Sequence, residues 1–150
     1  NGDNYKGQIL DGNRHGEGVL TYKNGNKYIG QWQNDKKNGF GKFFWAKGEK
    51  YFGNWKNDSR DGKGTYYYSN VEKFDGEWKQ NKRHGWGIYT WMEKVVAGED
   101  MKIKQKYDGQ WRDGRMDGFG SYQFQNGEIY KGNWKAGSME GEGEYIWPDG

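Results

Sequence analysis

The sequence predicts an all-β protein, built as a single-layer, twisted and elongated antiparallel sheet of stacked β-hairpins. Two observations predict this fold. A 23-residue pattern recurs along the chain, and within each copy large residues alternate with small or polar ones. Alternation with a period of two indicates a β-strand, and repetition at a fixed period is typical of arrays in which each unit packs on its neighbours.

Composition also favours an array over one globular core. Aromatic residues make up 19% of the 150 residues, whereas Ile, Leu and Val together number only twelve. The aliphatic side chains that fill an ordinary core are therefore missing. The nine Trp, twelve Tyr and seven Phe also exclude a disordered chain, because disordered segments are depleted in aromatic residues.

The first strand of each repeat carries the pattern aromatic-x-Gly-x-Trp, which places three residues on one face. In the first copy, Tyr5 is followed by Ile9 in the Trp position. The five complete copies supply rings that are expected to form rows along the sheet: Tyr28, Trp32, Tyr51, Trp55, Phe74, Trp78, Tyr107, Trp111, Tyr130 and Trp134.

The second strand carries Gly-x-Gly followed by two large residues two positions apart. The glycine pairs are Gly16/Gly18, Gly39/Gly41, Gly62/Gly64, Gly85/Gly87, Gly118/Gly120 and Gly141/Gly143. A glycine opposite a bulky ring leaves a slot in which the ring can lie flat, so Gly62→Val is expected to expel a ring.

Turns complete each repeat. About five polar residues are expected between the two strands, and an Asn-Gly type of turn, as at Asn24-Gly25, Asn126-Gly127 and Asp149-Gly150, is expected to lead into the next repeat. A strict two-residue turn would place the second-strand aromatics on the face opposite the next Tyr, whereas a bulge would bring them to the same face. The sequence does not decide between these two arrangements.

The repeats are expected at about 5–27, 28–50, 51–73, 74–106, 107–129 and 130–150, which makes residues 1–150 a single array. The fourth repeat holds a ten-residue insertion around 92–106, where alternation in Met101 to Lys106 suggests a lengthened hairpin. Because the pattern runs into both ends of the chain, we expect the array to have been cut from a longer protein.

This unit closely resembles the MORN (membrane occupation and recognition nexus) repeat, and the resemblance covers nearly the whole chain. Proteins of that family act in cytoskeletal, ciliary and membrane-contact assemblies, and similar repeats are found beside lipid-kinase and methyltransferase domains. The resemblance therefore implies a cytoplasmic protein, placed at the cytoskeleton, in a cilium or at the cytoplasmic face of a membrane.

The ten rings named above are candidates for a partner-binding groove. Most of each row is expected to pack the sheet, but a single layer cannot cover both of its own faces, so some aromatic surface should receive an amphipathic helix or an extended peptide. Trp55, Trp78 and Trp111 are expected to be exposed, and their replacement is expected to abolish capture of a partner protein.

Basic residues occupy nearly equivalent places between the strands and are expected to line one edge: Arg14, Lys36, Lys37, Arg60, Lys82, Arg83 and Arg115. Such an edge would attract anionic phospholipids, at about 1 kcal/mol per basic residue near a charged membrane surface. Interspersed Asp residues, among them Asp35 and Asp58, favour a solvated edge instead.

Other functions find no support in the residues. The net charge of +3 does not indicate nucleic-acid binding, and there is no Cys. His15 and His84 hold the same position three repeats apart, so they cannot meet around a metal. We therefore expect no catalysis, metal or cofactor. We expect a scaffold for a partner protein, with an anionic-lipid tether and a regulatory segment of an enzyme as alternatives, and with association of copies through the array ends as a further expectation.

Overall fold

The computed structural model describes residues 1–94 and 96–148, which form one sheet of twelve strands. Neighbouring strands are antiparallel, and their order in the sheet equals their order in the chain. The strands are β1 (Asn4–Leu10), β2 (Asn13–Thr21), β3 (Lys27–Gln33), β4 (Lys36–Phe44), β5 (Lys50–Lys56), β6 (Ser59–Tyr67), β7 (Glu72–Lys79), β8 (Lys82–Glu93), β9 (Lys102–Arg112), β10 (Arg115–Gln123), β11 (Ile129–Lys135) and β12 (Ser138–Ile146). The predicted sheet of stacked hairpins is confirmed.

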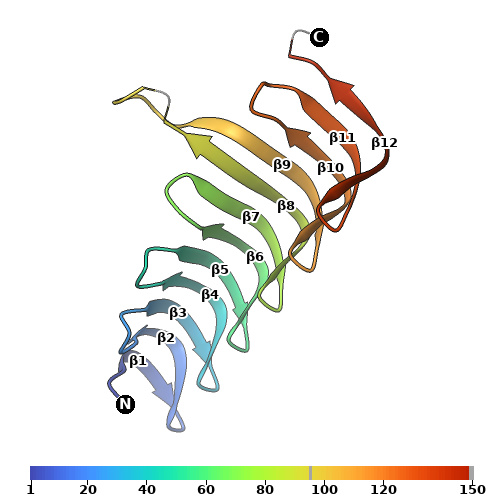
Figure 1. The fold of residues 1–150 in the computed structure, drawn as a ribbon. Coiled ribbons are helices and arrows are strands. Elements are labelled where there is room, and N and C mark those ends of the chain that lie inside the picture. Colours follow the sequence, from blue (N-terminus) through green and yellow to red (C-terminus); the bar gives the residue numbers. More distant parts are fainter. Residues whose placement is uncertain (95, 149–150) are drawn as a thin grey trace.

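The sheet has the shape of a bent and twisted strip (Figure 1). The strands lie side by side, with β1 and β12 at opposite ends, and each strand curves so that the strip is hollowed along its length. Turns within repeats follow one long rim, and turns between repeats follow the other. Within the described residues no second layer covers either face, so every buried side chain must be covered by its neighbours along the strip.

The turn inside each repeat has two residues. Gln33 pairs with Lys36, and Asn34 and Asp35 between them have φ angles of 49° and 69°. Positive φ at both central positions defines a type I′ turn, whose twist matches that of the flanking strands. The expectation of about five polar residues between the strands is wrong, because most of those residues belong to the second strand.

Except between β8 and β9, the turn between repeats has three residues. In the first such turn the N–H of Gly25 donates to the carbonyl of Tyr22 (2.9 Å), and Gly25 has a φ of 95°. This is a type I turn followed by a left-handed glycine. Because the number of turn residues is odd, Leu20 pairs directly with Tyr28. The first-strand rings and the large pairs of the second strand therefore lie on one face, which settles the alternative that the sequence left open.

A bulge in the second strand explains the first glycine of each Gly-x-Gly. In β6 the three residues Asp61, Gly62 and Lys63 together oppose Asn54 of β5. Gly62 has a φ of 98°, a conformation that side chains disfavour. The expected expulsion of a ring by Gly62→Val is wrong, because Gly62 serves the bulge and the ring lies on Gly64.

The second glycine forms the slot. Tyr51 lies across Gly64 so closely that a Cβ atom there would overlap the ring. The Tyr51 hydroxyl donates to the carbonyl of Asn54 (2.9 Å), and the ring meets Trp55 and Trp78 edge to face, with centroids 5.2 and 5.4 Å away. Equivalent units repeat along the sheet and form its core: Leu20, Tyr28, Trp32, Phe43, Tyr51, Trp55, Tyr66, Phe74, Trp78, Tyr89, Trp111, Tyr107, Tyr130 and Trp134.

The insertion lengthens the hairpin of β8 and β9, as the alternation predicts, and this hairpin projects beyond the others in Figure 1. Glu93 and Lys102 form the last pair before the tip of this hairpin. Lower in the hairpin the pairing shifts by one residue between Trp91 and Met92. Val95 of the insertion and the Asp149-Gly150 turn signal lie outside the described residues.

Candidate functional site

The ten rings predicted to bind a partner lie on one face, which we call the ring face, and all are buried. They are Tyr28, Trp32, Tyr51, Trp55, Phe74, Trp78, Tyr107, Trp111, Tyr130 and Trp134. The expected exposure of three tryptophans is wrong: Trp55, Trp78 and Trp111 are 6%, 5% and 6% exposed. The slot rings, which lie on the second glycine of each repeat, pack edge to face with tryptophans: Tyr28, Tyr51, Phe74 and Tyr107 each contact two, and Tyr130 contacts Trp134. The predicted binding role of these rings stays a prediction.

Each tryptophan also joins one repeat to the preceding one. The Nε1–H of Trp55 donates to the carbonyl of Gly41 (3.2 Å), and that of Trp78 donates to the carbonyl of Gly64 (3.0 Å). The bond recurs from Trp32, Trp111 and Trp134. A buried indole N–H needs a hydrogen-bond acceptor. The carbonyl of the neighbouring repeat supplies that acceptor, which makes Trp suitable at this position.

A second row of rings on the ring face remains partly accessible. Its members are Tyr22, Trp45, Tyr68 and Phe124, each just after a second strand, and Trp91, which lies within the longer strand β8. Trp45 contacts Tyr66 with centroids 5.2 Å apart, and Tyr68 stacks on Tyr89 at 5.5 Å and 18°. In the sequence these rings are the second member of each large pair. The three-residue turns, and in β8 the register shift after Trp91, place them on the same face as the core rings.

Four cations complete the ring face. Arg14, Lys37, Arg60 and Arg83 hold the same position in successive repeats, and each lies over the Trp ring of the next repeat, at 4.4, 5.1, 4.9 and 4.8 Å from its centroid. The expected single edge of basic residues is therefore wrong for these four. Lys36, Lys82 and Arg115 precede this row by one position, so they point away from the ring face and are exposed.

These cations also hold the turn of the next repeat. Arg14 donates from Nε to the Asp35 carboxylate (2.6 Å) and from Nη2 to the Asp35 carbonyl (2.9 Å), while the Asp35 N–H donates to the Arg14 carbonyl (3.1 Å). The hydrogen bond from Arg14 lowers the pKa of Asp35. Burial lowers the pKa of Lys37, although Asp58, with its carboxylate 3.5 Å away, opposes this effect.

Acidic and amide side chains lie on the other side of the ring face. The Tyr89 hydroxyl donates to Glu72 (2.7 Å), and the Tyr122 hydroxyl donates to Gln105 (2.6 Å). Tyr66 makes the equivalent bond to Glu49. Burial, and then the neighbouring carboxylate, raises the pKa of Tyr66 and of Tyr89.

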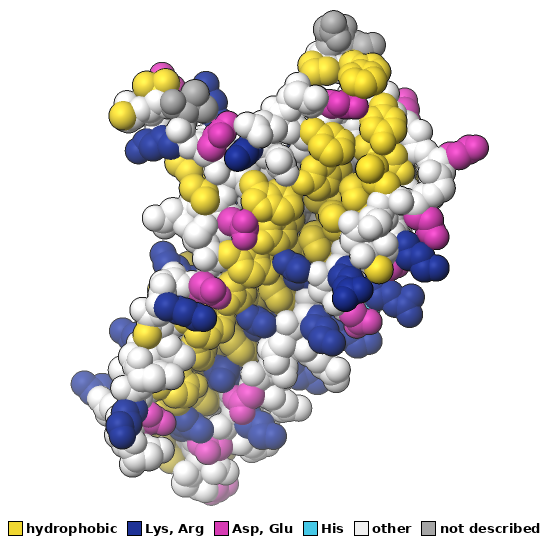
Figure 2. Space-filling view, viewed as in Figure 1, with side chains coloured by type: hydrophobic (Ala, Val, Ile, Leu, Met, Phe, Trp, Pro, Cys, Tyr) yellow, Lys and Arg dark blue, Asp and Glu magenta, His cyan; other side chains and the backbone are white. Residues whose placement is uncertain are grey.

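The ring face forms a continuous apolar band (Figure 2). Hydrophobic side chains run in a hollow from one end of the sheet to the other, with Lys and Arg among them towards β1 and fewer towards β12. The opposite face carries scattered exposed aromatics, among them Phe40, Trp86 and Phe119 at 50%, 47% and 50% exposure.

A family model for the MORN repeat matches residues 5–27, 28–50, 51–70, 74–92, 107–129 and 130–150, which covers most of the chain. The chain belongs to the MORN-repeat family. A search of curated proteins gave no match. The six matched segments coincide with the hairpins of the sheet, so the slot rings, tryptophans and glycines described above are the recurring parts of a MORN unit.

In this MORN array the cation row changes along the chain. The fifth and sixth repeats carry Met116 and Met139 where the earlier repeats carry Lys or Arg. The partner in the turn changes as well, from Asp35 and Asp58 to Asn81, Gly114 and Gly137. Along the ring face, this position therefore holds cations paired with Asp in the first two repeats, arginines beside uncharged turn residues in the next two, and methionine in the last two.

The MORN array offers no metal site or membrane-spanning helix in its described part. Residues 1–94 and 96–148 contain no group of three His, Cys, Asp or Glu side chains that could hold a metal ion. No helix in the same residues is long and apolar enough to cross a membrane. His15 and His84 hold equivalent positions in β2 and β8, three hairpins apart.

Proposed function

We propose that this chain is a non-catalytic scaffold that binds a segment of a partner protein along its ring face. The observation that carries the proposal is the continuous hollow band of rings, in which Tyr22, Trp45, Tyr68, Trp91 and Phe124 stay partly accessible. Contiguous apolar surface of this extent typically marks an interaction site. A sheet ordinarily buries its apolar face against a second layer of structure, and a bound partner would supply that layer here.

The shape of the band supports a protein segment as its occupant. The band is long, narrow and hollow, and large aromatic rings beside arginines are the residue types that contribute most to binding energy in protein interfaces. An amphipathic helix laid in a hydrophobic groove buries one apolar stripe in this way. The setting that we propose is a cytoskeletal, ciliary or membrane-associated assembly in the cytoplasm, which the MORN repeats suggest.

The experiment compares the two faces of the sheet. The chain with Trp45, Tyr68 and Trp91 replaced by Ser serves as bait in affinity capture from a cell extract, with mass spectrometry of the captured proteins. The matched control replaces Phe40, Trp86 and Phe119 of the opposite face by Ser, so that both variants lose three large rings. We expect the ring-face variant alone to lose its partner, with the sheet retained by circular dichroism. Equal capture by both folded variants would contradict the proposal.

A second candidate is a tether to anionic phospholipid. Its support is the exposure of Lys36, Lys82 and Arg115 along one rim. It requires that the chain cosediments with phosphatidylserine vesicles in a salt-sensitive manner and that neutralisation of these three residues abolishes binding. Binding that persists in the neutralised variant would reject it.

A further inference from the structure

Within the described part of the chain, two neighbouring arginines of the ring face have no acidic partner. Arg60 donates from Nη2 to the carbonyl of Asn81 (2.9 Å), and its buried Nε has no hydrogen-bond partner. Arg83 donates to the carbonyl of Gly114 (2.6 Å) and to the hydroxyl of Tyr68 (3.2 Å). Among residues 1–94 and 96–148, ion pairs to this row of cations involve Arg14 and Lys37. A guanidinium has five N–H donors, so both arginines retain donors for a ligand.

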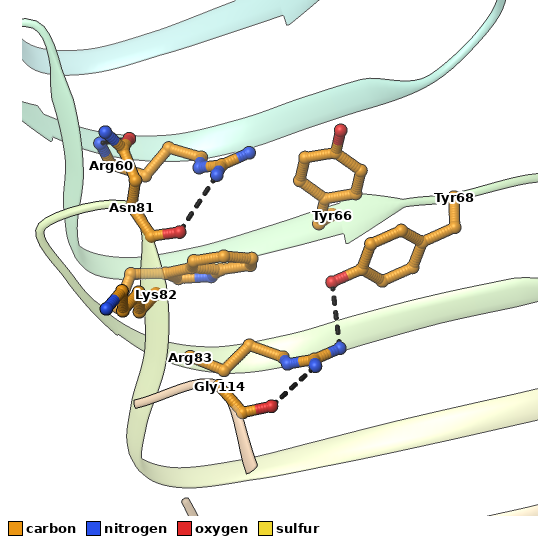
Figure 3. Close-up of a pocket in the computed structure, with 8 residues that line it drawn as sticks. Arg60, Tyr66, Tyr68, Asn81, Lys82, Arg83 and Gly114 are labelled. Carbon is orange, nitrogen blue, oxygen red and sulfur yellow. Dashed lines mark hydrogen bonds between the residues drawn. The ribbon is translucent and has the colours of Figure 1, made fainter. Parts of the chain in front are cut away.

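Both arginines border a pocket on the ring face (Figure 3). The two guanidinium groups extend towards the side of the pocket where Tyr66 and Tyr68 lie, and Trp78 also lines it. The pocket volume of about 250 Å³ is below the range of roughly 300–1,000 Å³ that is usual for sites of small molecules. A side chain from a larger partner therefore suits it better than a free ligand. Arg83 also lines the next pocket along the face, beside Trp91 and Met116.

The backbone of the sheet favours a helix as the occupant. Strands β6, β7, β8 and β9 are hydrogen-bonded on both sides, so the floor of the band offers no free row of backbone groups. An extended segment laid across them would leave its own N–H and C=O groups unpaired, whereas a helix satisfies these groups internally.

The spacing of the repeats defines where the charges of that helix should lie. Arg60 and Arg83 are one repeat apart, and two strands at about 4.8 Å each separate equivalent positions by roughly 10 Å. Seven residues of a helix rise about 10.5 Å and return to the same face. Glu49 and Glu72 lie on the other side of the band, so acidic residues are favoured only on the helix flank that faces the arginines.

We propose that the ring face binds an amphipathic helix with two acidic residues seven positions apart, whose carboxylates pair with Arg60 and Arg83. This inference rests on the proposed function and specifies the chemistry of its partner. A carboxylate over each guanidinium would complete the series of ion pairs that Asp35 and Asp58 provide for the two preceding repeats.

The test uses a displayed library of helical peptides with Leu fixed at heptad positions and all other positions random. One selection is made against the chain and another against the Arg60→Met/Arg83→Met variant. Methionine is native at the equivalent position 116, so this variant is expected to fold, which circular dichroism and tryptophan fluorescence verify. We expect Asp or Glu pairs seven residues apart to be enriched only by the unmodified chain, and Met116→Arg to enrich a third acidic residue one heptad further along.

The most enriched peptide is then synthesised with both acidic residues as Glu or both as Gln. We expect the Gln peptide to bind the unmodified chain about ten- to a hundredfold more weakly, and to bind the double Met variant about as well as the Glu peptide does. An equal loss with both proteins would overturn the proposal. Enriched helices without spaced acidic pairs, or no enriched helix at all, would also overturn it while leaving partner capture by the ring face as a separate result.

Phosphatidylserine vesicles form the last arm of the test. Vesicle binding that disappears in the Arg60→Met/Arg83→Met variant, without an acidic preference among the selected peptides, would assign these arginines to lipid and overturn the proposal. We expect vesicle binding, where it occurs, to be the same for both proteins.

Discussion

Gly64→Ala tests the slot on which the core depends. The backbone of Gly64 needs no left-handed conformation, but a Cβ atom there would overlap the ring of Tyr51. Tyr51 is fully buried between Trp55 and Trp78 and cannot move sideways without displacing them. The substitution should therefore expel or tilt the ring, although it adds only one methyl group.

The magnitude follows from the contacts of Tyr51. Two edge-to-face contacts contribute about 0.5–1.5 kcal/mol each, and the hydrogen bond from the Tyr51 hydroxyl to Asn54 contributes about 1 kcal/mol. If the ring stays, overpacking costs about 1–3 kcal/mol instead. We expect Gly64→Ala to lower the free energy of unfolding by about 2–4 kcal/mol.

Urea denaturation followed by tryptophan fluorescence measures this loss, and a double-mutant cycle with Tyr51→Ala identifies its cause. Without the ring, Gly64→Ala should cost less than about 0.5 kcal/mol. Gly62→Ala is the matched control, because its φ of 98° makes it strained independently of the ring, so Tyr51→Ala should not relieve its cost. A Gly64→Ala loss that persists unchanged in the Tyr51→Ala background would refute the slot.

Three further predictions concern the joints between repeats and the buried rings. Trp78→Phe should lower the free energy of unfolding by about 1–3 kcal/mol, measured in urea, because the Gly64 carbonyl loses its donor; an unchanged stability would show that the bond contributes nothing. Lys37→Met should leave stability at pH 7 unchanged or raise it by up to about 1 kcal/mol, because burial lowers the pKa of a side chain that is only 12% exposed. In the folded state Lys37 then binds its proton less tightly than in the unfolded state. The gain in free energy of unfolding from Lys37→Met should therefore shrink as pH rises through the lowered pKa, and a gain that does not change with pH would contradict this cause. Burial raises the pKa of Tyr28, Tyr51 and Tyr107 above the ordinary value of 10.0, so their contribution to stability is complete below pH 10 and is lost as pH rises beyond it; the tyrosinate absorbance of these three residues, identified by Tyr→Phe variants, should appear only together with loss of the sheet, and their titration near pH 10 in an intact sheet would exclude this.

The sequence predicts the sheet and the members of its core because the constraint is local. A ring, a glycine two positions later and a tryptophan two further on must share a face of one strand, and six registered copies repeat this pattern. The exposed fraction of each tryptophan is less predictable, because Trp55 and Trp78 are buried in part by Tyr28 and Tyr51 of the preceding repeats.

The sequence predicts the residues of the cation row but not the site that they form. Adjacent basic residues such as Lys36 and Lys37 look equivalent in the sequence, yet strand alternation sends them to opposite faces. Which of them turns inward depends on the two-residue turn and the bulge, whose positions the glycines indicate only once their φ angles are known. The same position in the repeat also holds Met116, a substitution that a search for charge alone overlooks.

The hairpin of β8 and β9 shows how the array absorbs an irregularity. Its last pair, Glu93 with Lys102, encloses an even number of residues in the sequence, which alone would send every ring that follows to the opposite face. The single-residue shift between Trp91 and Met92 reverses this again before Tyr107. The disturbance is cancelled within one hairpin. Foreign segments should therefore be graftable at this tip, such as a fluorescent reporter or a second recognition module, without altering the register of the repeats on either side.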